Sequence, residues 1–169
     1  MEILVEEYRG KILENVHCGR ICVSDDQGKI IGGVGDPNQM TYFRSSSKPI
    51  QMLPVLVRGL DQKYGLTDQE ITILAGSHAG QPCHLNAVLS LLKKTGYQEE
   101  DLIMNPVYPD CMETRDQMIS QQLPPRKALH NCAGKHIAAM MLADDLCGDH
   151  RDYWRPESMA QREILHYIS

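Results

Sequence analysis

The chain has 169 residues, and its 17 basic side chains stand against 22 acidic ones, which gives a net charge of −5. This balance excludes a generally basic nucleic-acid binder, because phosphate contacts need an excess of Lys and Arg. No apolar run approaches the roughly 20 residues that cross a bilayer, and the acidic N-terminus lacks the pattern of a signal peptide. We therefore expect one domain over residues 1–169 in the cytoplasm, with no nucleic-acid or membrane partner.

The first 42 residues are predicted to contain strands. Residues 2–8 are β-prone, and two apolar runs flank the turn Asp25-Asp26-Gln27-Gly28. Asp and Gly in a four-residue gap between such runs are typical of a hairpin. We expect this hairpin within residues 19–35 and a loop over residues 36–42.

The next segment is predicted to be a helix that contains two prolines. It is expected to begin near residues 45–47 and to reach Arg58. Pro49 falls in the first turn, where its missing N–H is harmless. Pro54 is expected to kink the helix or to end it early, because proline cannot donate a hydrogen bond to the preceding turn.

Helix and strand signals alternate further along the chain. The pattern Thr67-Asp68-Gln69-Glu70 predicts a capping box and a short helical turn, whereas the apolar residues 71–75 are expected to form a strand. Apolar periodicity and a following glycine predict helices over residues 84–95 and 134–146, and residues 156–169 are also helical in pattern. This mixture indicates an α+β or α/β fold.

The first candidate site is the Ser-x-x-Lys motif of Ser45 and Lys48. Residues three apart in a helical turn share a face, so the hydroxyl and the amine can hydrogen-bond. A serine becomes a good nucleophile only when a base takes its proton. Lys48 can be that base in its neutral form, which burial and a helix N-terminus favour. The alternative is that these residues only cap a helix.

The second candidate site is the polar segment 77–84, which follows the apolar residues 71–75. Loops of this kind often line functional sites. Ser77 could carry or relay a proton, His78 could position a substrate carboxylate, and backbone N–H groups near Gly80 could hold an oxyanion. The alternative is a helix start at which the serine and the histidine satisfy backbone groups.

The third candidate site is the segment 130–136, which has five polar or soft donors in seven positions directly before a predicted helix. Cys132 lies three residues before Lys135 and four before His136, so either pair could bind one metal ion. A thiol at a helix N-terminus ionises readily, and a lysine becomes a ligand once it loses its proton. The alternative is a well-capped helix with a half-buried cysteine.

Together, the three clusters resemble the asparaginase II family, the Rhizobium-type L-asparaginases. The matching motifs are Arg44-Ser45-Ser46-Ser47-Lys48-Pro49-Ile50-Gln51, then Ser77-His78-Ala79-Gly80-Gln81-Pro82 with His84, and then His130-Asn131-Cys132-Ala133-Gly134-Lys135-His136. Their order and spacing match as well, and the third motif is highly specific. The resemblance runs from about Val5 to the end of the chain.

The resemblance implies a fold like that of serine β-lactamases and penicillin-binding proteins, and hydrolysis of L-asparagine to aspartate and ammonia. It implies catalytic roles for Ser45, Lys48 and Ser77, and a zinc ion held by Cys132 and Lys135. The residues expected to contact the substrate are Arg44, His78, Gly80, Asn131 and His136. We also expect a homo-oligomer, specifically a homodimer.

The chain departs from the family in two substitutions and in length. Gln81 stands where family members usually have Glu, which removes a charge near the site, and Ala133 stands where they often have Ser. Family members are also longer, which implies that a further zinc-ligating cysteine and a lysine partner of Ser77 lie outside residues 1–169. We therefore expect the N-terminal half of such a protein, with weak zinc binding and no asparaginase activity on its own.

Two other functions are compatible with the same residues. The first is another serine hydrolase on the same scaffold, such as a penicillin-recognising or peptide-cleaving enzyme, which a β-lactam would label at Ser45. The second is a non-catalytic metal- or ligand-binding remnant, which would bind zinc without turnover.

Overall fold

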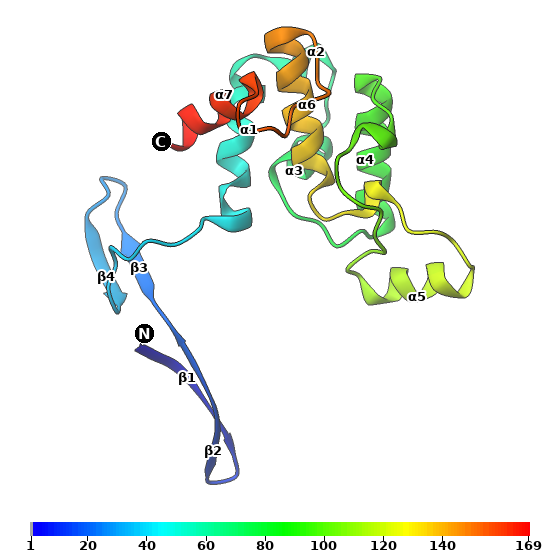
Figure 1. Cartoon of the computed structure of the whole chain (residues 1–169). Helices are drawn as coiled ribbons and strands as arrows, with labels where there is room; N and C mark the ends of the chain where they lie inside the picture. Colours follow the sequence, from blue (N-terminus) through cyan, green and yellow to red (C-terminus); the bar gives the residue numbers. More distant parts are fainter. Residues whose placement is uncertain (1) are drawn as a thin grey trace. The chain divides into compact units, whose positions relative to one another are not determined.

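The computed structural model describes residues 2–169, and the chain divides into a compact unit that ends at Tyr42 and a second unit, Phe43–Ser169. Strands occur in the first unit and helices in the second, so the predicted mixture of α and β structure is confirmed (Figure 1). Among the described residues, no helix combines the length and the apolarity that a bilayer crossing needs. The likeness to the serine β-lactamase fold stays a prediction.

The first unit consists of two antiparallel hairpins. β1 (Glu2–Arg9) pairs with β2 (Ile12–Gly19), and β3 (Ile21–Ser24) pairs with β4 (Ile30–Val34). The second hairpin confirms the prediction for residues 19–35, and Asp25 shapes its turn by accepting hydrogen bonds from the backbone N–H groups of residues 27 and 29. The β-prone start at residues 2–8 is also confirmed, whereas β2 was not predicted.

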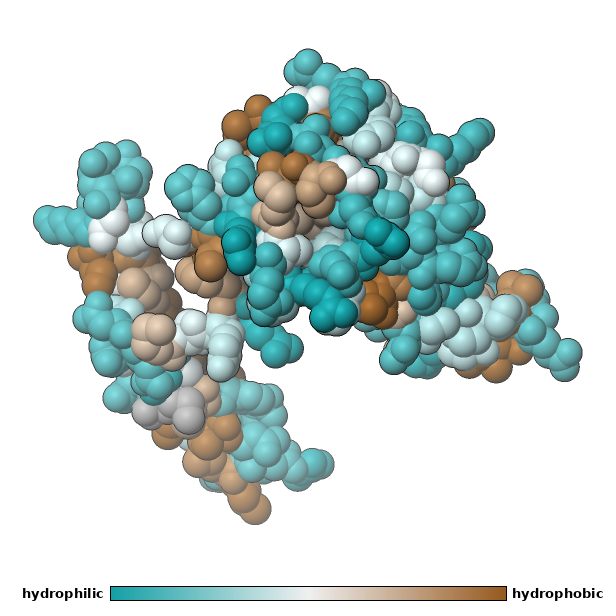
Figure 2. Space-filling view, turned by 45° about the horizontal axis from the view of Figure 1, so that its top comes forward, coloured by the Kyte–Doolittle hydropathy of each residue, from teal (hydrophilic) through white to brown (hydrophobic). Residues whose placement is uncertain are grey.

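Both hairpins expose large apolar side chains, several of which are brown in Figure 2. Ile12 is the most exposed of them in the first hairpin, and Ile31 is the most exposed in the second. A two-stranded ribbon is only marginally stable in water by itself. The buried hydrophobic residues of the described chain, from Met52 to Ile164, all lie in the second unit.

The second unit is built from seven α-helices and three short 3-10 helices among the described residues. They are, in chain order, η1 (Arg44–Ser47), α1 (Lys48–Val57), α2 (Leu60–Lys63), α3 (Asp68–Ala75), α4 (Pro82–Thr95), η2 (Glu99–Asp101), α5 (Met112–Ser120), η3 (Lys127–Leu129), α6 (Ala133–Cys147) and α7 (Met159–Ile168). The helices predicted over residues 84–95, 134–146 and 156–169 correspond to α4, α6 and α7. The expected first helix corresponds to η1 and α1, and Pro54 does not end α1, which continues to Val57.

The expectation of a strand over residues 71–75 was wrong, because these residues form the second half of α3. The predicted capping box is present at the start of this helix: Thr67 Oγ1 accepts from the Glu70 N–H, and Glu70 Oε2 accepts from the Thr67 N–H at 2.7 Å. Once this cap fixes the first turn, the apolar run continues the helix and buries Ile73 and Leu74. The apolar residues alone could not distinguish a buried strand from a buried helix.

The core is centred on α6, which is buried along most of its length and lies between α1 and α4 in Figure 1. It packs against α1, α3, α4 and α7. Gly134 allows the closest approach, since a Cβ atom at this position would lie 1.9 Å from the carbonyl oxygen of Ile73. The start of α6 therefore rests directly on the backbone of α3. This contact brings the segment 130–136 beside the loop that follows α3.

Candidate active site

Lys48 connects all three of the clusters singled out in the sequence. It lies in the first turn of α1 and is 2% exposed. Its Nζ atom lies 2.6 Å from Ser77 Oγ, 3.3 Å from the Gly76 carbonyl oxygen and 3.4 Å from the Asn131 carbonyl oxygen. Ser77 is exposed. The structure therefore places a buried amine against a hydroxyl that solvent or a ligand can reach.

Ser45 lies near Lys48 but contacts it through the backbone. The Lys48 N–H donates to the Ser45 carbonyl oxygen. Within residues 2–169, Nζ of Lys48 donates to Ser77 and to the two carbonyls and not to Ser45 Oγ. Ser45 is exposed and lines a hollow of about 250 Å³ together with Arg44, Lys48, Gln51, Cys132 and Lys135.

The turn that carries Ser45 is strained at Arg44. Arg44 has φ +54°, a left-handed conformation that is uncommon for a residue with a side chain. Ser47 Oγ donates to the Arg44 carbonyl oxygen at 2.9 Å, and Gln51 Nε2 donates to Ser47 Oγ at 2.7 Å. These bonds hold the strained turn against α1. Strain of this kind is concentrated at functional sites.

His78 is buried beside this pair and is electrically neutral near pH 7. The backbone N–H of His78 donates to the Asn131 carbonyl oxygen, and the ring atom Nδ1 accepts a hydrogen bond from the backbone N–H of Gly80 at 3.2 Å. Burial is the main cause that lowers the pKa of His78 to about 4, and the electrostatic effects of His84 and Lys48 act in the same direction. Nδ1 is thus the acceptor, Nε2 carries the proton, and Nε2 is buried without a partner among the described residues.

Gly80 shapes the loop between Ser77 and α4. Its φ is +72°, and a Cβ atom there would lie 2.5 Å from Pro109 Cβ. Cys111 donates its N–H to the neighbouring Ala79 carbonyl oxygen at 2.8 Å. The loop therefore packs tightly against residues 109–111. The Gly80 N–H is already used by His78 within this loop, so it is not free in this conformation to bind an oxyanion.

The model of the L-asparaginase II family matches residues 5–169. This range includes Lys48, Ser77 and the third cluster together with the helices that position them. The chain belongs to the L-asparaginase II family. No curated protein matches it. The resemblance drawn from the three motifs is confirmed at the level of the family.

In this L-asparaginase II family member, Cys132 and Lys135 lie on the same hollow as Ser45, but they do not make a complete zinc site. Cys132 is the N-cap residue of α6. Residues 2–169 contain no group of three or more His, Cys, Asp or Glu side chains that could hold a metal ion. Catalytic zinc sites use about three protein ligands and structural sites use four. The donors in the described residues therefore do not fit a resident zinc ion on their own.

Two residues at the site of the family member were not predicted from the sequence. Asp110 accepts a hydrogen bond from Asn131 Nδ2 at 3.2 Å, and Tyr153 OH lies 3.0 Å from His136 Nδ1. Asp110 falls in a proline-rich loop and Tyr153 follows α6, outside every recognised motif. Only the folded chain brings them to the site.

Proposed function

We propose that the chain is an L-asparagine amidohydrolase in which Lys48 and Ser77 form the reacting pair. The observation that carries this proposal is the 2.6 Å separation between a buried lysine nitrogen and the hydroxyl of an exposed serine. The family supports the substrate class, because its name is that of an asparagine hydrolase. The pair supports the reaction type, because amide hydrolysis through a serine needs a base beside the hydroxyl.

The hydrogen-bond partners of Lys48 allow it to act as a base once it has lost a proton. A neutral amine has two N–H groups and one lone pair, whereas a carbonyl oxygen only accepts and a hydroxyl both donates and accepts. The charged ammonium can donate to Ser77 Oγ and to both carbonyls, whereas in the neutral amine the two N–H groups can stay on the carbonyls of Gly76 and Asn131 and the lone pair then faces the Ser77 hydroxyl. No carboxylate among residues 2–169 forms a salt bridge with Lys48. This arrangement supports Lys48 as a base.

The proposed reaction has two halves. Lys48 takes the proton of Ser77, the serine oxygen attacks the side-chain amide carbon of asparagine, and the leaving ammonia takes the proton from Lys48. The C–N bond breaks and a seryl ester forms. Water, deprotonated by Lys48, then attacks the ester and releases aspartate and the free serine. Ser45 lines the hollow beside Lys48 and is the alternative nucleophile. No step is assigned to zinc.

The nucleophile can be identified with a diazoketone analogue of asparagine, which alkylates the attacking oxygen. In a form of the protein that also contains the lysine partner of Ser77 and the further cysteine implied by the family, we expect ammonia release from L-asparagine, and mass spectrometry should find the label on Ser77. A label on Ser45 would transfer the nucleophilic role to that serine. Labelling by a β-lactam without ammonia release would instead support a penicillin-recognising hydrolase, and zinc binding without label or turnover would support a non-catalytic protein.

A further inference from the structure

We propose that a cavity beside Lys48, lined by Lys135 and His136, binds a small carboxylate, and that Tyr153 is the positioning residue that aims His136 at it. The source we assign is the α-carboxylate of the amide substrate, and this part rests on the proposed function. The existence of the cavity, its charge and its hydrogen-bond donors are independent of the proposed function.

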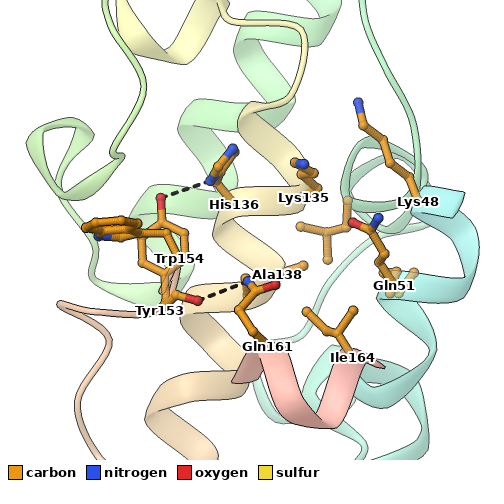
Figure 3. Close-up of a pocket in the computed structure, with 12 residues that line it drawn as sticks. Lys48, Gln51, Lys135, His136, Ala138, Tyr153, Trp154, Gln161 and Ile164 are labelled. Atoms are coloured by element: carbon orange, nitrogen blue, oxygen red, sulfur yellow. Dashed lines mark hydrogen bonds between the residues drawn. The ribbon is translucent and has the colours of Figure 1, made fainter. Parts of the chain in front are cut away.

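The cavity lies between α1, α6 and α7 and has a volume of about 170 Å³ (Figure 3). Its polar side chains come from all three helices: Gln51 from α1, Lys135 and His136 from α6, and Gln161 from α7. Met52, Leu74 and Ile164 contribute apolar surface. A few convergent polar groups on an apolar wall are typical of a small-molecule site, and this volume suits only a small ligand.

The charge of the cavity favours an anion. Lys135 contributes an ammonium group to its lining, and Lys48 carries no negative charge in either protonation state. No Asp or Glu lines the cavity, and none forms a salt bridge with Lys135 within the described residues. A lysine with no carboxylate of its own in a partly enclosed space can gain a charge-assisted hydrogen bond from a ligand carboxylate.

Tyr153 fixes the hydrogen-bonding role of His136. The Ile103 N–H donates to the Tyr153 hydroxyl oxygen at 3.1 Å, so the single hydroxyl proton is free to point to His136 Nδ1, 3.0 Å away. Nδ1 is then an acceptor and Nε2 must carry the proton of the neutral ring. Nε2 has no hydrogen-bond partner among the described residues, and His136 lines the cavity. His136 therefore offers an N–H donor to a ligand there.

Tyr153 is itself held firmly. It is 2% exposed, and its carbonyl oxygen accepts hydrogen bonds from Ser158 Oγ at 3.1 Å and from Gln161 Nε2 at 3.0 Å. Figure 3 shows the tyrosine hydroxyl directed at His136 and the carbonyl directed at Gln161. The same residue thus ties α7 to the cavity and sets the tautomer of the histidine.

Binding can be measured without turnover, so a negative result for carboxylate binding can be distinguished from a negative result for the proposed hydrolysis. Metal-free Ser77→Ala protein in a chelator is titrated with L-asparagine and with β-alaninamide, which is asparagine without its α-carboxylate. We expect L-asparagine to bind at least about tenfold more tightly than β-alaninamide, the effect of one charge-assisted hydrogen bond. Adding Lys135→Gln should remove that preference, whereas adding Lys93→Gln, at an exposed lysine of α4, should keep it. Equal affinities of the two ligands for the Ser77→Ala protein would overturn the proposal.

The positioning role has its own readout in the ¹⁵N NMR spectrum of the His136 ring. The parent protein should show the Nε2–H tautomer, and Tyr153→Phe should mix the tautomers and weaken L-aspartate binding by about fivefold, the effect of one neutral hydrogen bond. Tyr97→Phe removes another buried hydroxyl, one that bonds Asp144, and should change neither. An Nδ1–H tautomer in the parent protein would contradict the role assigned to Tyr153.

A competition experiment decides the source of the carboxylate. Acetate is titrated into the Ser77→Ala protein with and without saturating L-asparagine. Competition between the two supports the substrate α-carboxylate as the occupant. Simultaneous binding would overturn that assignment, because the cavity would then serve a separate carboxylate effector.

Discussion

Lys48 has one short hydrogen bond, to Ser77, and two long ones to backbone carbonyls. Lys48→Met keeps the length of the side chain and removes the base. We expect this change to lower kcat/KM for L-asparagine, and the decrease should correspond to a loss of at least about 3 kcal/mol of transition-state stabilisation. Ser77→Ala should have a similar effect, and the double variant should be little worse, because the two residues act as one unit. Steady-state ammonia release measures all three.

Ser45→Ala is the matched comparison for Ser77→Ala, because both serines are exposed and lie near Lys48. A smaller loss with Ser45→Ala would agree with the short contact between Lys48 and Ser77. If Ser45→Ala abolishes turnover while Ser77→Ala leaves most of it, the nucleophile is Ser45 and the hydrogen bond to Ser77 serves a proton relay. Circular dichroism of each variant checks that the fold is retained.

Cys132 and Lys135 give the described residues two donors for zinc, fewer than protein zinc sites use. We expect zinc to bind weakly and to be removed by chelators. Cys132→Ser should weaken binding further, by at least about tenfold, because a thiolate ligand is lost. Cys147→Ser, at the other end of α6, is the control and should bind zinc as the parent does. Unchanged zinc affinity in Cys132→Ser would assign this cysteine to packing.

The sequence predicted the residues of the site better than their contacts. The Ser-x-x-Lys spacing drew attention to Lys48, but it suggested Ser45 as the partner because only local spacing is readable along a chain. Ser77 is 29 positions away, and its contact depends on how α3 packs against α6. Tyr153 and Asp110 could not be predicted, because no local pattern links a tyrosine after α6 or an aspartate in a proline-rich loop to the site.

At the scale of elements, the helices with a terminal glycine and an apolar period were predicted closest to their observed bounds. α4 and α6 have apolar faces and a terminal glycine, and both lie close to the predicted ranges. Residues 71–75 offered only an apolar run, so α3 was mistaken for a strand after its capped first turn. β2 follows a two-residue turn at Gly10 and Lys11, in which Gly10 has φ +66°, and this turn signal was missed. Local signals alone therefore could not settle short elements whose state depends on packing.

The contact between α3 and α6 gives a prediction for Gly134→Ala. The new Cβ atom would lie 1.9 Å from the Ile73 carbonyl oxygen, so the two helices must move apart. We expect the free energy of unfolding to fall by about 3 kcal/mol, which is at the upper end of the range for overpacking. We also expect a loss of activity, because Ser77 and Lys135 lie on opposite sides of this contact and would move apart. Gly32→Ala, where the added Cβ meets nothing within 4 Å, should change stability by less than about 0.5 kcal/mol. Equal effects in denaturant unfolding would contradict this packing argument.

At the scale of the whole molecule, buried titratable groups link folding to pH in two ranges. Burial alone would raise the pKa of Glu70, but hydrogen bonds from Lys94, Ser90 and Thr67 outweigh it and hold the pKa at about 2. The stability contributed by this carboxylate is present above its unfolded pKa near 4.5 and is lost as the pH falls toward 2. The buried His78 and the half-buried His136 act at higher pH, because desolvation lowers the pKa of each to about 4.

The last prediction concerns His78 and the acid side of the stability curve. Between its unfolded pKa of 6.5 and its folded pKa of about 4, the unfolded chain binds the proton more strongly, so stability falls as the pH is lowered through this range. The loss assignable to His78 is up to about 3 kcal/mol. His78→Asn keeps an acceptor for the Gly80 N–H but does not titrate, so urea unfolding at pH 7, 5.5 and 4.5 should show a flatter dependence than the parent. Part of the slope should remain, because His136 still titrates.

His166→Asn, at an exposed histidine of α7, should reproduce the parent curve. A parent-like slope in His78→Asn would show that this ring is not held neutral by burial.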